Sequence, residues 1–346
     1  MKVFYSDIQK AHNPDTFIVS GAQRPIPEVP ERADRLLRAV ERLGLTPSAP
    51  GDCGRGPLAA VHTPEYLDFL ATIHGEWQGL GGSPVVVPNV HPDRRDCAYP
   101  VSPVGRAGYH LSDTACPVSA QTWESVRASA AAAVAAARTV ADGEGQAYAL
   151  CRPPGHHAFA DMAGGFCYLN NAAIAVQLLT GRYPRVATLD VDLHHGHGTQ
   201  GIFYARDDVL TVSIHADPMH FYPFFWGHPA ERGTGRGLGY NLNLPLPLKS
   251  GDDDFLAALE RAAARLRAFV PGALVVSLGL DASQDDPFGG LSVTPAGFER
   301  VGRFVAALDL PTVLVQEGGY VSDSLTENLF RFLFGFREVR RARSAS

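Results

Sequence analysis

Acidic side chains and histidines follow four apolar runs of the sequence. The runs are VATLDV (186–191), VLTVSI (209–214), ALVVSLGL (273–280) and TVLVQ (312–316). The polar residues behind them are Asp192, His194, His195 and His197, then His215, then Asp281, and finally Glu317 and Tyr320. Ligands of open α/β sheets bind at the carboxyl ends of the strands. Four such ends with acids and histidines predict a functional site at one edge of a sheet.

Asp192 and His194 have the spacing of a shared metal site. Residues i and i+2 of an extended segment point to the same side, so the carboxylate and the imidazole can face one ion. Asp281, behind another strand, would supply a third ligand. Three protein ligands with open positions are typical of catalytic zinc. Fe²⁺ can occupy the same ligands, so the sequence leaves the metal open.

Two further motifs supply groups that catalysis at such a metal needs. His156 and His157 end the stiff run RPPGHH, and a histidine can take a proton from water and return it to a leaving amine. Tyr320 ends the run EGGY, and a phenol can donate a hydrogen bond to a developing oxyanion. Alone, either motif is equally typical of ordinary packing. Their combination with the acids favours catalysis.

The elements that would position these residues alternate along the chain. The four apolar runs are continuous, as expected of strands buried on both faces. Helical spacing is found in residues 30–43, 123–140, 255–269 and 295–308. This alternation predicts an α/β fold with a central, mostly parallel sheet flanked by helices. Because no second strand–helix series is present, we expect a single domain over residues 1–346.

Residues 79–120 differ from the rest of the chain. They are rich in Gly, Pro and Ser and show no helical or strand period. A loop of this length inside a compact domain is usually functional or disordered. We interpret it as an insertion. Its apolar residues Val85, Val86, Val87, Tyr99 and Tyr109 are more than a solvated linker needs.

Composition narrows the class of protein. The 346 residues are 45% hydrophobic and 19% charged with a net charge of −6, which is typical of a soluble globular protein and lacks the basic excess of nucleic-acid binders. The five cysteines form no CxxC, which favours a reducing compartment. No signal-like or membrane-spanning apolar run is present. We therefore predict a cytoplasmic protein without nucleic-acid or membrane partners.

The assembled motifs resemble those of a known family. CRPPGHH, GGFCYLNNAAIA, LDVDLHHGHGTQ, SLGLDASQDDP and EGGY occur in the order and spacing of the zinc-dependent histone deacetylase superfamily. Within it, the sequence is most similar to the bacterial acetylpolyamine amidohydrolases. The resemblance spans about residues 1–337 and implies the arginase–deacetylase α/β fold, a zinc-dependent hydrolysis of linear amides and a small cationic acylated amine as substrate.

The resemblance also implies a role for individual residues. It makes Asp192, His194 and Asp281 the zinc ligands, and His157 the general base and acid. His156 would be the electrostatic partner of His157, Asp190 the carboxylate that backs His156, and Tyr320 the oxyanion donor. The substrate-binding residues implied are Phe166, Phe225, Gly165, Asp113 and Phe288. Two structural K⁺ sites are implied, the first with Asp190, Asp192, His194, Ser213 and Ile214, the second with Phe203, Arg206, Val209 and Tyr240.

Two positions depart from the family pattern. His197 stands where the family has Asp or Asn behind the second active-site histidine. Phe288 stands where one polyamine-selective branch has a specificity-setting glutamate. Deacetylation of acetylated lysine in peptides or proteins is therefore an alternative to polyamine deacetylation.

Alternatives outside this chemistry are less well supported by the residues. A two-manganese ureohydrolase of the same fold needs acids at the positions of Gly196 and Gly279. A non-catalytic binding protein would have no need of the complete metal and catalytic set. In similar amidohydrolases the insertion pairs across a two-fold axis, which implies a homodimer with a narrowed channel.

Overall fold

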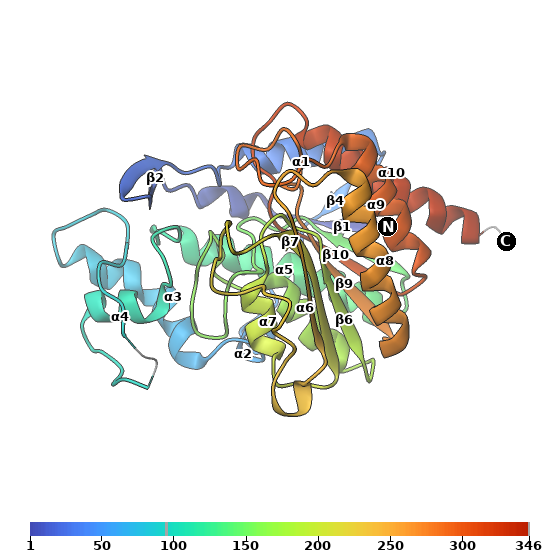
Figure 1. Cartoon of the computed structure of the whole chain (residues 1–346). Helices are drawn as coiled ribbons and strands as arrows, with labels where there is room; N and C mark the ends of the chain where they lie inside the picture. The colour runs from blue at the N-terminus through green and yellow to red at the C-terminus, as the bar shows by residue number, and fades with distance from the viewer. Residues whose placement is uncertain (94–95, 345–346) are drawn as a thin grey trace.

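A parallel sheet forms the centre of the molecule (Figure 1). The computed structural model describes residues 1–93 and 96–344. In these residues eight strands pair in the order β4-β1-β5-β10-β9-β6-β7-β8, and all neighbours are parallel. They span Lys2–Phe4 (β1), Pro47–Ser48 (β4), Gln146–Ala149 (β5), Val186–Asp190 (β6), Val209–Ala216 (β7), Asn241–Leu246 (β8), Ala273–Leu278 (β9) and Thr312–Gln316 (β10). The predicted α/β class is confirmed.

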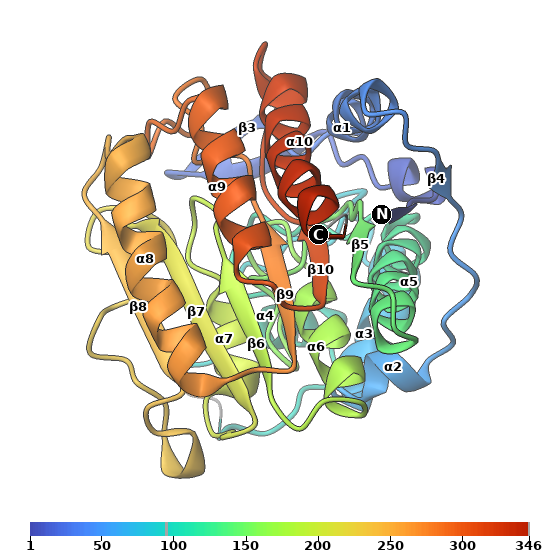
Figure 2. The same cartoon turned by 90° about the vertical axis from the view of Figure 1, so that its right-hand side faces the viewer.

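Helices cover both faces of this sheet. In Figure 2, α8 (Asp252–Phe269), α9 (Pro295–Ala307) and α10 (Leu325–Ser344) lie in front of the strands. The helix α1 (Glu31–Arg42) packs against α10. The helices α5 (Thr122–Ala141), α6 (Asn171–Thr180) and α7 (His197–Phe203) cover the opposite face. All four predicted helical segments are present, with ends that differ by at most three residues from the prediction.

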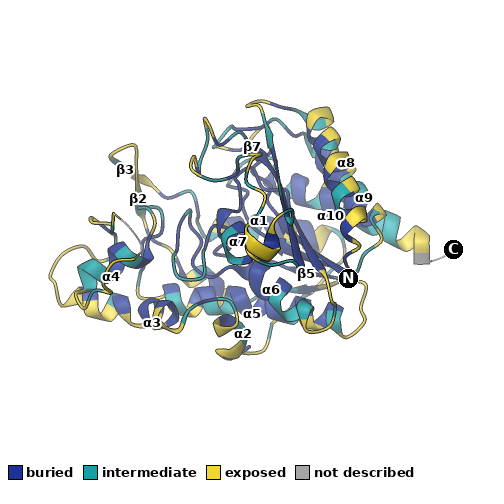
Figure 3. Ribbon diagram, turned by 60° about the horizontal axis from the view of Figure 1, so that its bottom comes forward, coloured by how far each residue is buried: buried dark blue, intermediate teal, exposed yellow. Residues whose placement is uncertain are grey.

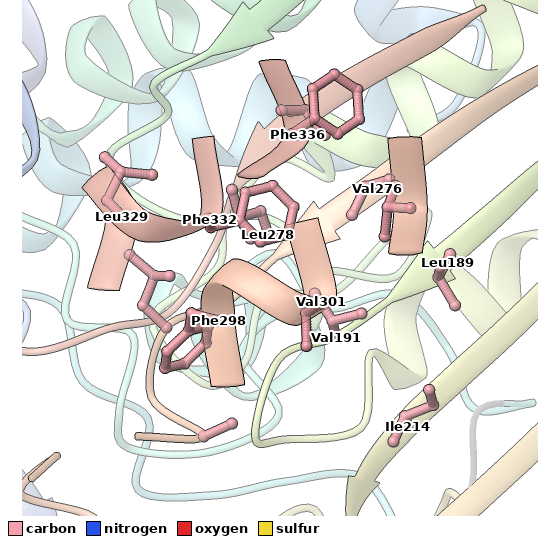
Figure 4. Close-up of a cluster of buried hydrophobic side chains, with 14 of the residues drawn as sticks. Leu189, Val191, Ile214, Val276, Leu278, Phe298, Val301, Leu329, Phe332 and Phe336 are labelled. Atoms are coloured by element: carbon pink, nitrogen blue, oxygen red, sulfur yellow. The ribbon is translucent and has the colours of Figure 1, made fainter. Parts of the chain in front are cut away.

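Alternation along the strands divides the core in two. Leu189, Val276 and Leu278 pack in one cluster with α9 and α10, as the close-up of Phe298, Phe332 and their neighbours shows (Figure 4). The intervening residues Val186 and Val275 pack in a second cluster with α5 and α6. Full burial of one such side chain contributes about 1.5–3 kcal/mol. Both faces of the strands are therefore largely apolar, and the acidic residues lie at or after the strand ends.

The remaining elements form a smaller part beside the sheet. They are the antiparallel ribbon of β2 (Thr16–Val19) and β3 (Ala22–Pro25), the helices α2 (Gly56–Ala59), α3 (Pro64–Gln78) and α4 (Pro103–His110), and 3₁₀ turns at Asp7–Ala11 and Gly235–Gly237. Thr63 caps α3 with its side chain, accepting from the N–H of Tyr66, and Pro64 occupies the first helical position. Both residue types favour a helix start.

The prediction that residues 79–120 lack regular structure was wrong. The segment contains α4, and Val86 pairs with Val118 in an isolated antiparallel bridge. The sequence pattern did not predict this helix because it has only eight residues and two of them, Gly105 and Gly108, are glycines. Residues 94 and 95 of this segment lie outside the described residues. Figure 3 shows that much of the segment is exposed.

Candidate metal centre and active site

The carboxyl ends of β6 and β9 bring three potential ligands together. His194 Nδ1 lies 3.3 Å from Asp192 Oδ1 and 3.2 Å from Asp281 Oδ2. All three side chains are buried, and one ligand atom from each lies within 4.8 Å of the others. The structure therefore brings together the residues that the i, i+2 spacing and the strand-end rule selected.

This donor set fits a divalent cation. Burial, and then the charge of Asp192, raise the pKa of Asp281, because two carboxylates face each other away from water. A cation between them would relieve this repulsion. Space for the carboxylates depends on Gly318, since a Cβ there would collide with both Asp281 and Asp192. The Gly318 N–H donates to Asp192 Oδ2 over 2.8 Å, and the Leu193 N–H donates to Asp281 Oδ1 over 2.9 Å.

The tandem histidines lie beside this cluster with different partners. His156 Nδ1 donates to Asp190 Oδ2 over 2.9 Å. Burial alone would lower the pKa of His156, but the charges of Asp192 and Asp190 outweigh it and raise the pKa to about 10. Burial, and then the charge of His156, hold the pKa of His157 well below its usual range. The two rings, whose centroids are 4.0 Å apart, therefore have pKa values that are shifted in opposite directions.

His157 is paired with a third imidazole. Its Nδ1 lies 3.1 Å from Nδ1 of His197, so one hydrogen serves both nitrogens. Burial lowers the pKa of His197 to about 3, so this ring is neutral. A neutral imidazole can accept the Nδ1–H of His157, which leaves the Nε2 lone pair of His157 available as a base. His197 thus has hydrogen-bonding capacity at a position where the family has Asp or Asn.

Tyr320 is enclosed by aromatic rings and an arginine. Its ring lies 4.7 Å from Phe288 and 5.9 Å from Phe166, and the Arg32 guanidinium lies 4.8 Å from its centroid. Burial raises the pKa of Tyr320 well above its usual value, so the phenol keeps its proton. Arg32 also donates from Nη2 to the carbonyl of Glu317 over 2.7 Å and from Nε to the carbonyl of Gly319. It thus holds the segment that carries the tyrosine.

Hydrogen bonds link the insertion to two residues that lie beside His157. Asp113 Oδ2 accepts the Gly165 N–H at 3.0 Å and the Tyr222 hydroxyl at 2.8 Å. The Tyr222 ring lies 5.1 Å from that of His157. Gly165 has φ +53, and a Cβ there would collide with the His157 ring. The predicted residues Asp113 and Gly165 therefore lie at the site, although both oxygens of the Asp113 carboxylate are already hydrogen bonded within the protein.

The predicted aromatic walls have different surroundings. Phe166 is 7% exposed and Phe225 is 85% exposed. Among the described residues no ring contact joins these two. Phe288 lies beside both Tyr320 and His194, with ring centroids 4.7 and 5.2 Å away. Phe288 and Phe166 are thus the phenylalanines next to the tyrosine.

The residues of the implied K⁺ sites lie behind the catalytic edge. Asp190 and Ser213 pair across β6 and β7 and border a small internal cavity of about 10 Å³. Asp192, His194 and Ile214 flank them in the chain. Of the second set, Phe203 ends α7, Val209 begins β7, and the Tyr240 carbonyl accepts the N–H of Thr211.

Several residues at the site were not selected from the sequence. They are Arg32, Glu28, Asp286 and Tyr222, and Glu317 was selected only as an acid at a strand end. Glu28 bonds Arg32 over 2.6 Å and Arg152 over 3.0 Å, and Glu317 accepts the N–H groups of Gly155 and His156. The sequence signal was limited to the unusual runs SQDDP, YPFF and EGGY, which contain Asp286, Tyr222 and Glu317.

The fold and the site together define an α/β protein of the metal-dependent amidohydrolase type. Residues 26–333 match the family described as "Histone deacetylase domain", and the chain belongs to this family. It is therefore a hydrolytic deacetylase that acts on amides, and the family implies a metal cofactor.

Individual relatives resemble the chain over its full length. It is 48% identical to "Acetylpolyamine amidohydrolase" of Burkholderia pseudomallei, over 98% of this chain and 100% of that protein. It is 43% identical to "Acetylpolyamine amidohydrolase 1" of Pseudomonas aeruginosa, over 97% and 99%. A crystal structure of acetylpolyamine aminohydrolase from Burkholderia pseudomallei superposes with a TM-score of 0.95, at 48% identity, covering 98% of this chain and 99% of that one.

Two further observations concern the cysteines and the helices. All five cysteines are free thiols. Within residues 1–93 and 96–344, no helix is both long enough and apolar enough to cross a membrane.

Proposed function

We propose that this protein removes acetyl groups from small N-acetylated amines, with acetylated polyamines as the substrate class. The observation that carries the proposal is the convergence of Asp192, His194 and Asp281 beside His157 and Tyr320. The full-length similarity to relatives named acetylpolyamine amidohydrolase supports the choice of substrate. The reaction consumes water and an N-acetyl amine and yields acetate and the free amine.

Asp192, His194 and Asp281 would hold zinc, and Fe²⁺ is compatible with the same ligands. Bound there, the metal would polarise a water molecule and the amide carbonyl. The buried carboxylates offset much of its charge, so groups of the protein must stabilise the reaction further. His156, His157 and Tyr320 would provide this stabilisation.

His157 acts as the proton carrier. Because it is neutral, it can take a proton from the attacking water and then deliver it to the departing amine nitrogen. His156, whose pKa is raised by the charges of Asp192 and Asp190, stabilises negative charge as it develops nearby. The Tyr320 hydroxyl donates a hydrogen bond to the oxyanion that forms from the acetyl carbonyl.

The substrate would enter between aromatic rings. Phe166 and Phe288 lie beside Tyr320, and an aliphatic amine chain suits such apolar walls. Gly165 leaves room next to His157, and the Asp113 carboxylate contributes negative charge near the path of a cationic amine. Phe225, exposed on the loop after β7, would contact the substrate at the rim.

Structural K⁺ ions are proposed at both implied sites. Asp190 and Ser213, with Asp192, His194 and Ile214, would hold the first, and Phe203, Arg206, Val209 and Tyr240 would hold the second. The small cavity beside Asp190 and Ser213 supports the first site. A cytoplasmic location is also proposed, and the five free thiols support it because they suit a reducing compartment.

We further propose a homodimer that pairs through the segment 79–120. Exposed apolar residues in this segment support the proposal: Val101 is 93% exposed, and Leu80, Val90 and Tyr99 are also exposed. Clustered exposed apolar groups are typical of an interface. Pairing at this place would narrow the entrance to the site and favour slim amines over folded proteins.

The test measures kcat/KM of the zinc-loaded enzyme on N-acetylputrescine and on an acetyl-lysine peptide. The proposal requires the acetylamine to be the better substrate. A preference for the peptide would favour the lysine deacetylase alternative, and no turnover of either would refute the function.

The dimer proposal is tested with a variant in which a short Gly/Ser bridge replaces residues 83–106. The dimer proposal requires a monomer by light scattering and a relative gain on the peptide.

A further inference from the structure

A buried aspartate joins two segments of the active site. Asp286 is 6% exposed and lies in the loop that follows β9. Its Oδ2 accepts the backbone N–H of Tyr320 over 2.9 Å. Its Oδ1 accepts the backbone N–H of Phe288 over 3.0 Å. One carboxylate therefore fixes the main chain at both the tyrosine and the phenylalanine that faces it.

Both anchored residues need such a restraint. Tyr320 follows Gly318 and Gly319, and Gly319 has φ +114. Phe288 precedes two further glycines, Gly289 and Gly290. Glycine leaves the backbone more conformations than any other residue, so neither ring is held firmly by its own segment. Arg32 already holds the carbonyls on the tyrosine segment, and a charge-assisted hydrogen bond to a backbone N–H is a strong contact that supplies a further restraint.

The two anchored rings meet at the reacting centre. Phe288 and Tyr320 pack edge to face with centroids 4.7 Å apart, and Phe288 lies 5.2 Å from His194. Burial of a carboxylate such as that of Asp286 costs free energy, which packing alone does not offset. Burial, and then the charge of Asp281, raise the pKa of Asp286 to about 7. A buried carboxylate with both oxygens on active-site N–H groups points to a role in holding their geometry.

We propose that Asp286 is a positioning residue that sets the Tyr320 hydroxyl and the Phe288 ring relative to the metal cluster. It acts through these two residues and does not touch the substrate. The expected loss of kcat rests on the proposed amide hydrolysis. The claim that Asp286 holds the backbone of Tyr320 and Phe288 rests on the two hydrogen bonds alone.

The first test compares Asp286→Asn with Asp285→Asn. The asparagine keeps one oxygen but turns an NH₂ group toward the other backbone N–H, so one of the two bonds is lost. Asp285 is exposed and adjacent, which makes its substitution a matched control. We expect kcat to fall about a hundredfold in Asp286→Asn, since a misplacement of about 1 Å has effects of that order. Zinc content and Asp285→Asn should match the parent, and an unchanged kcat in Asp286→Asn would overturn the proposal.

The second test asks whether the effect passes through the phenol. In the Tyr320→Phe background the hydroxyl is absent, so Asp286→Asn should lower kcat much less than it does in the parent. Strictly additive losses would show that Asp286 acts by another route, and would overturn the role proposed here.

The third test does not depend on turnover. Hydrogen exchange of the Tyr320 and Phe288 amides should become faster in Asp286→Asn and stay unchanged in Asp285→Asn. If the parent hydrolyses no acetylated amine, the proposed function fails while exchange still decides the positioning role. Equal exchange in all three proteins would overturn that role. If Asp286→Asn does not fold, Asp286→Ser, which also removes one acceptor, replaces it in each measurement with the same expected results.

Discussion

The two adjacent histidines of the site lie in opposite electrostatic surroundings. Asp190, a carboxylate, accepts a hydrogen bond from His156, and the pKa of His156 is raised to about 10. His197, a neutral imidazole, pairs with His157, and the pKa of His157 is well below its usual range. The rings themselves are only 4.0 Å apart. The surroundings thus shift the two pKa values in opposite directions: the charges of Asp192 and Asp190 outweigh burial at His156, whereas burial and then the charge of His156 lower the pKa of His157.

This difference divides the work between two identical side chains. A ring that is already protonated cannot accept a proton, so His156 is suited to electrostatic stabilisation. A neutral ring can accept one and return it, so His157 is suited to proton transfer. Environments that push two pKa values apart are a general means of assigning acid and base roles. The pair therefore predicts unequal consequences when either partner is changed.

The largest effect is expected from His157→Asn. The variant loses the neutral base, and kcat should fall by about a hundredfold to ten-thousandfold. His156→Asn keeps the base and should be less damaging. Both kcat values are measured on N-acetylputrescine after zinc content has been matched. If His156→Asn proves to be the more damaging change, the division of roles is wrong.

Tyr320→Phe should lower kcat by about a hundredfold to a thousandfold, because one oxyanion donor is lost. Metal content and substrate binding should remain, since the ring and its aromatic neighbours are kept. The shape of the pH–rate profile should also stay the same, because neither histidine has changed its partner. A near-normal kcat would remove Tyr320 from the mechanism.

Asp190→Asn removes the negative charge of the side chain that accepts a hydrogen bond from His156. Removal of a carboxylate that orients a functional imidazole by a hydrogen bond typically changes activity by about tenfold to a hundredfold. The loss of negative charge lowers the pKa of His156, so its cationic form disappears at a lower pH. The alkaline limb of the pH–rate profile should therefore move to lower pH. An unmoved alkaline limb would show that Asp190 does not set the charge of His156.

Of these variants, His197→Asp should change kcat least at the optimal pH. It would place a carboxylate behind both histidines. A carboxylate next to His157 raises the pKa of His157, because an opposite charge favours the protonated imidazole. Because His157 must be neutral to accept a proton, the acid limb of the profile should move to higher pH. His197→Asn, which adds no charge, should shift it less. An identical acid limb in parent and His197→Asp would make His197 a bystander.

The sequence predicted the parts of this molecule that depend on local patterns. The strands β6, β7, β9 and β10 are continuous apolar runs because helices cover both of their faces. Asp192, His194 and Asp281 follow from strand ends and i, i+2 spacing. The strands β1 and β5 have three and four residues, and β8 contains Pro245, so their patterns were too short or too mixed to select.

The residues that support the site could not be predicted from local sequence patterns. Arg32 and the Gly319 carbonyl that it binds are 287 positions apart, and Tyr222 and Asp113 are 109 apart. Such pairs depend on how the sheet is ordered and how loops return to it. One chain contains no signal for either, because a buried arginine in a helix and a tyrosine in a loop both have ordinary local interpretations.

The sheet order has a consequence for synthesis of the protein. The strand β10 is made last, yet it lies between β5 and β9 in the middle of the sheet. At the usual 5–20 residues per second, about 15 to 60 seconds pass before a ribosome reaches Thr312. Until then β5 and β9 have no partner between them, and Tyr320 and its Arg32 contact do not exist. We therefore expect the nascent chain to expose two apolar strand edges, and to gain its catalytic centre only when its final strand is inserted.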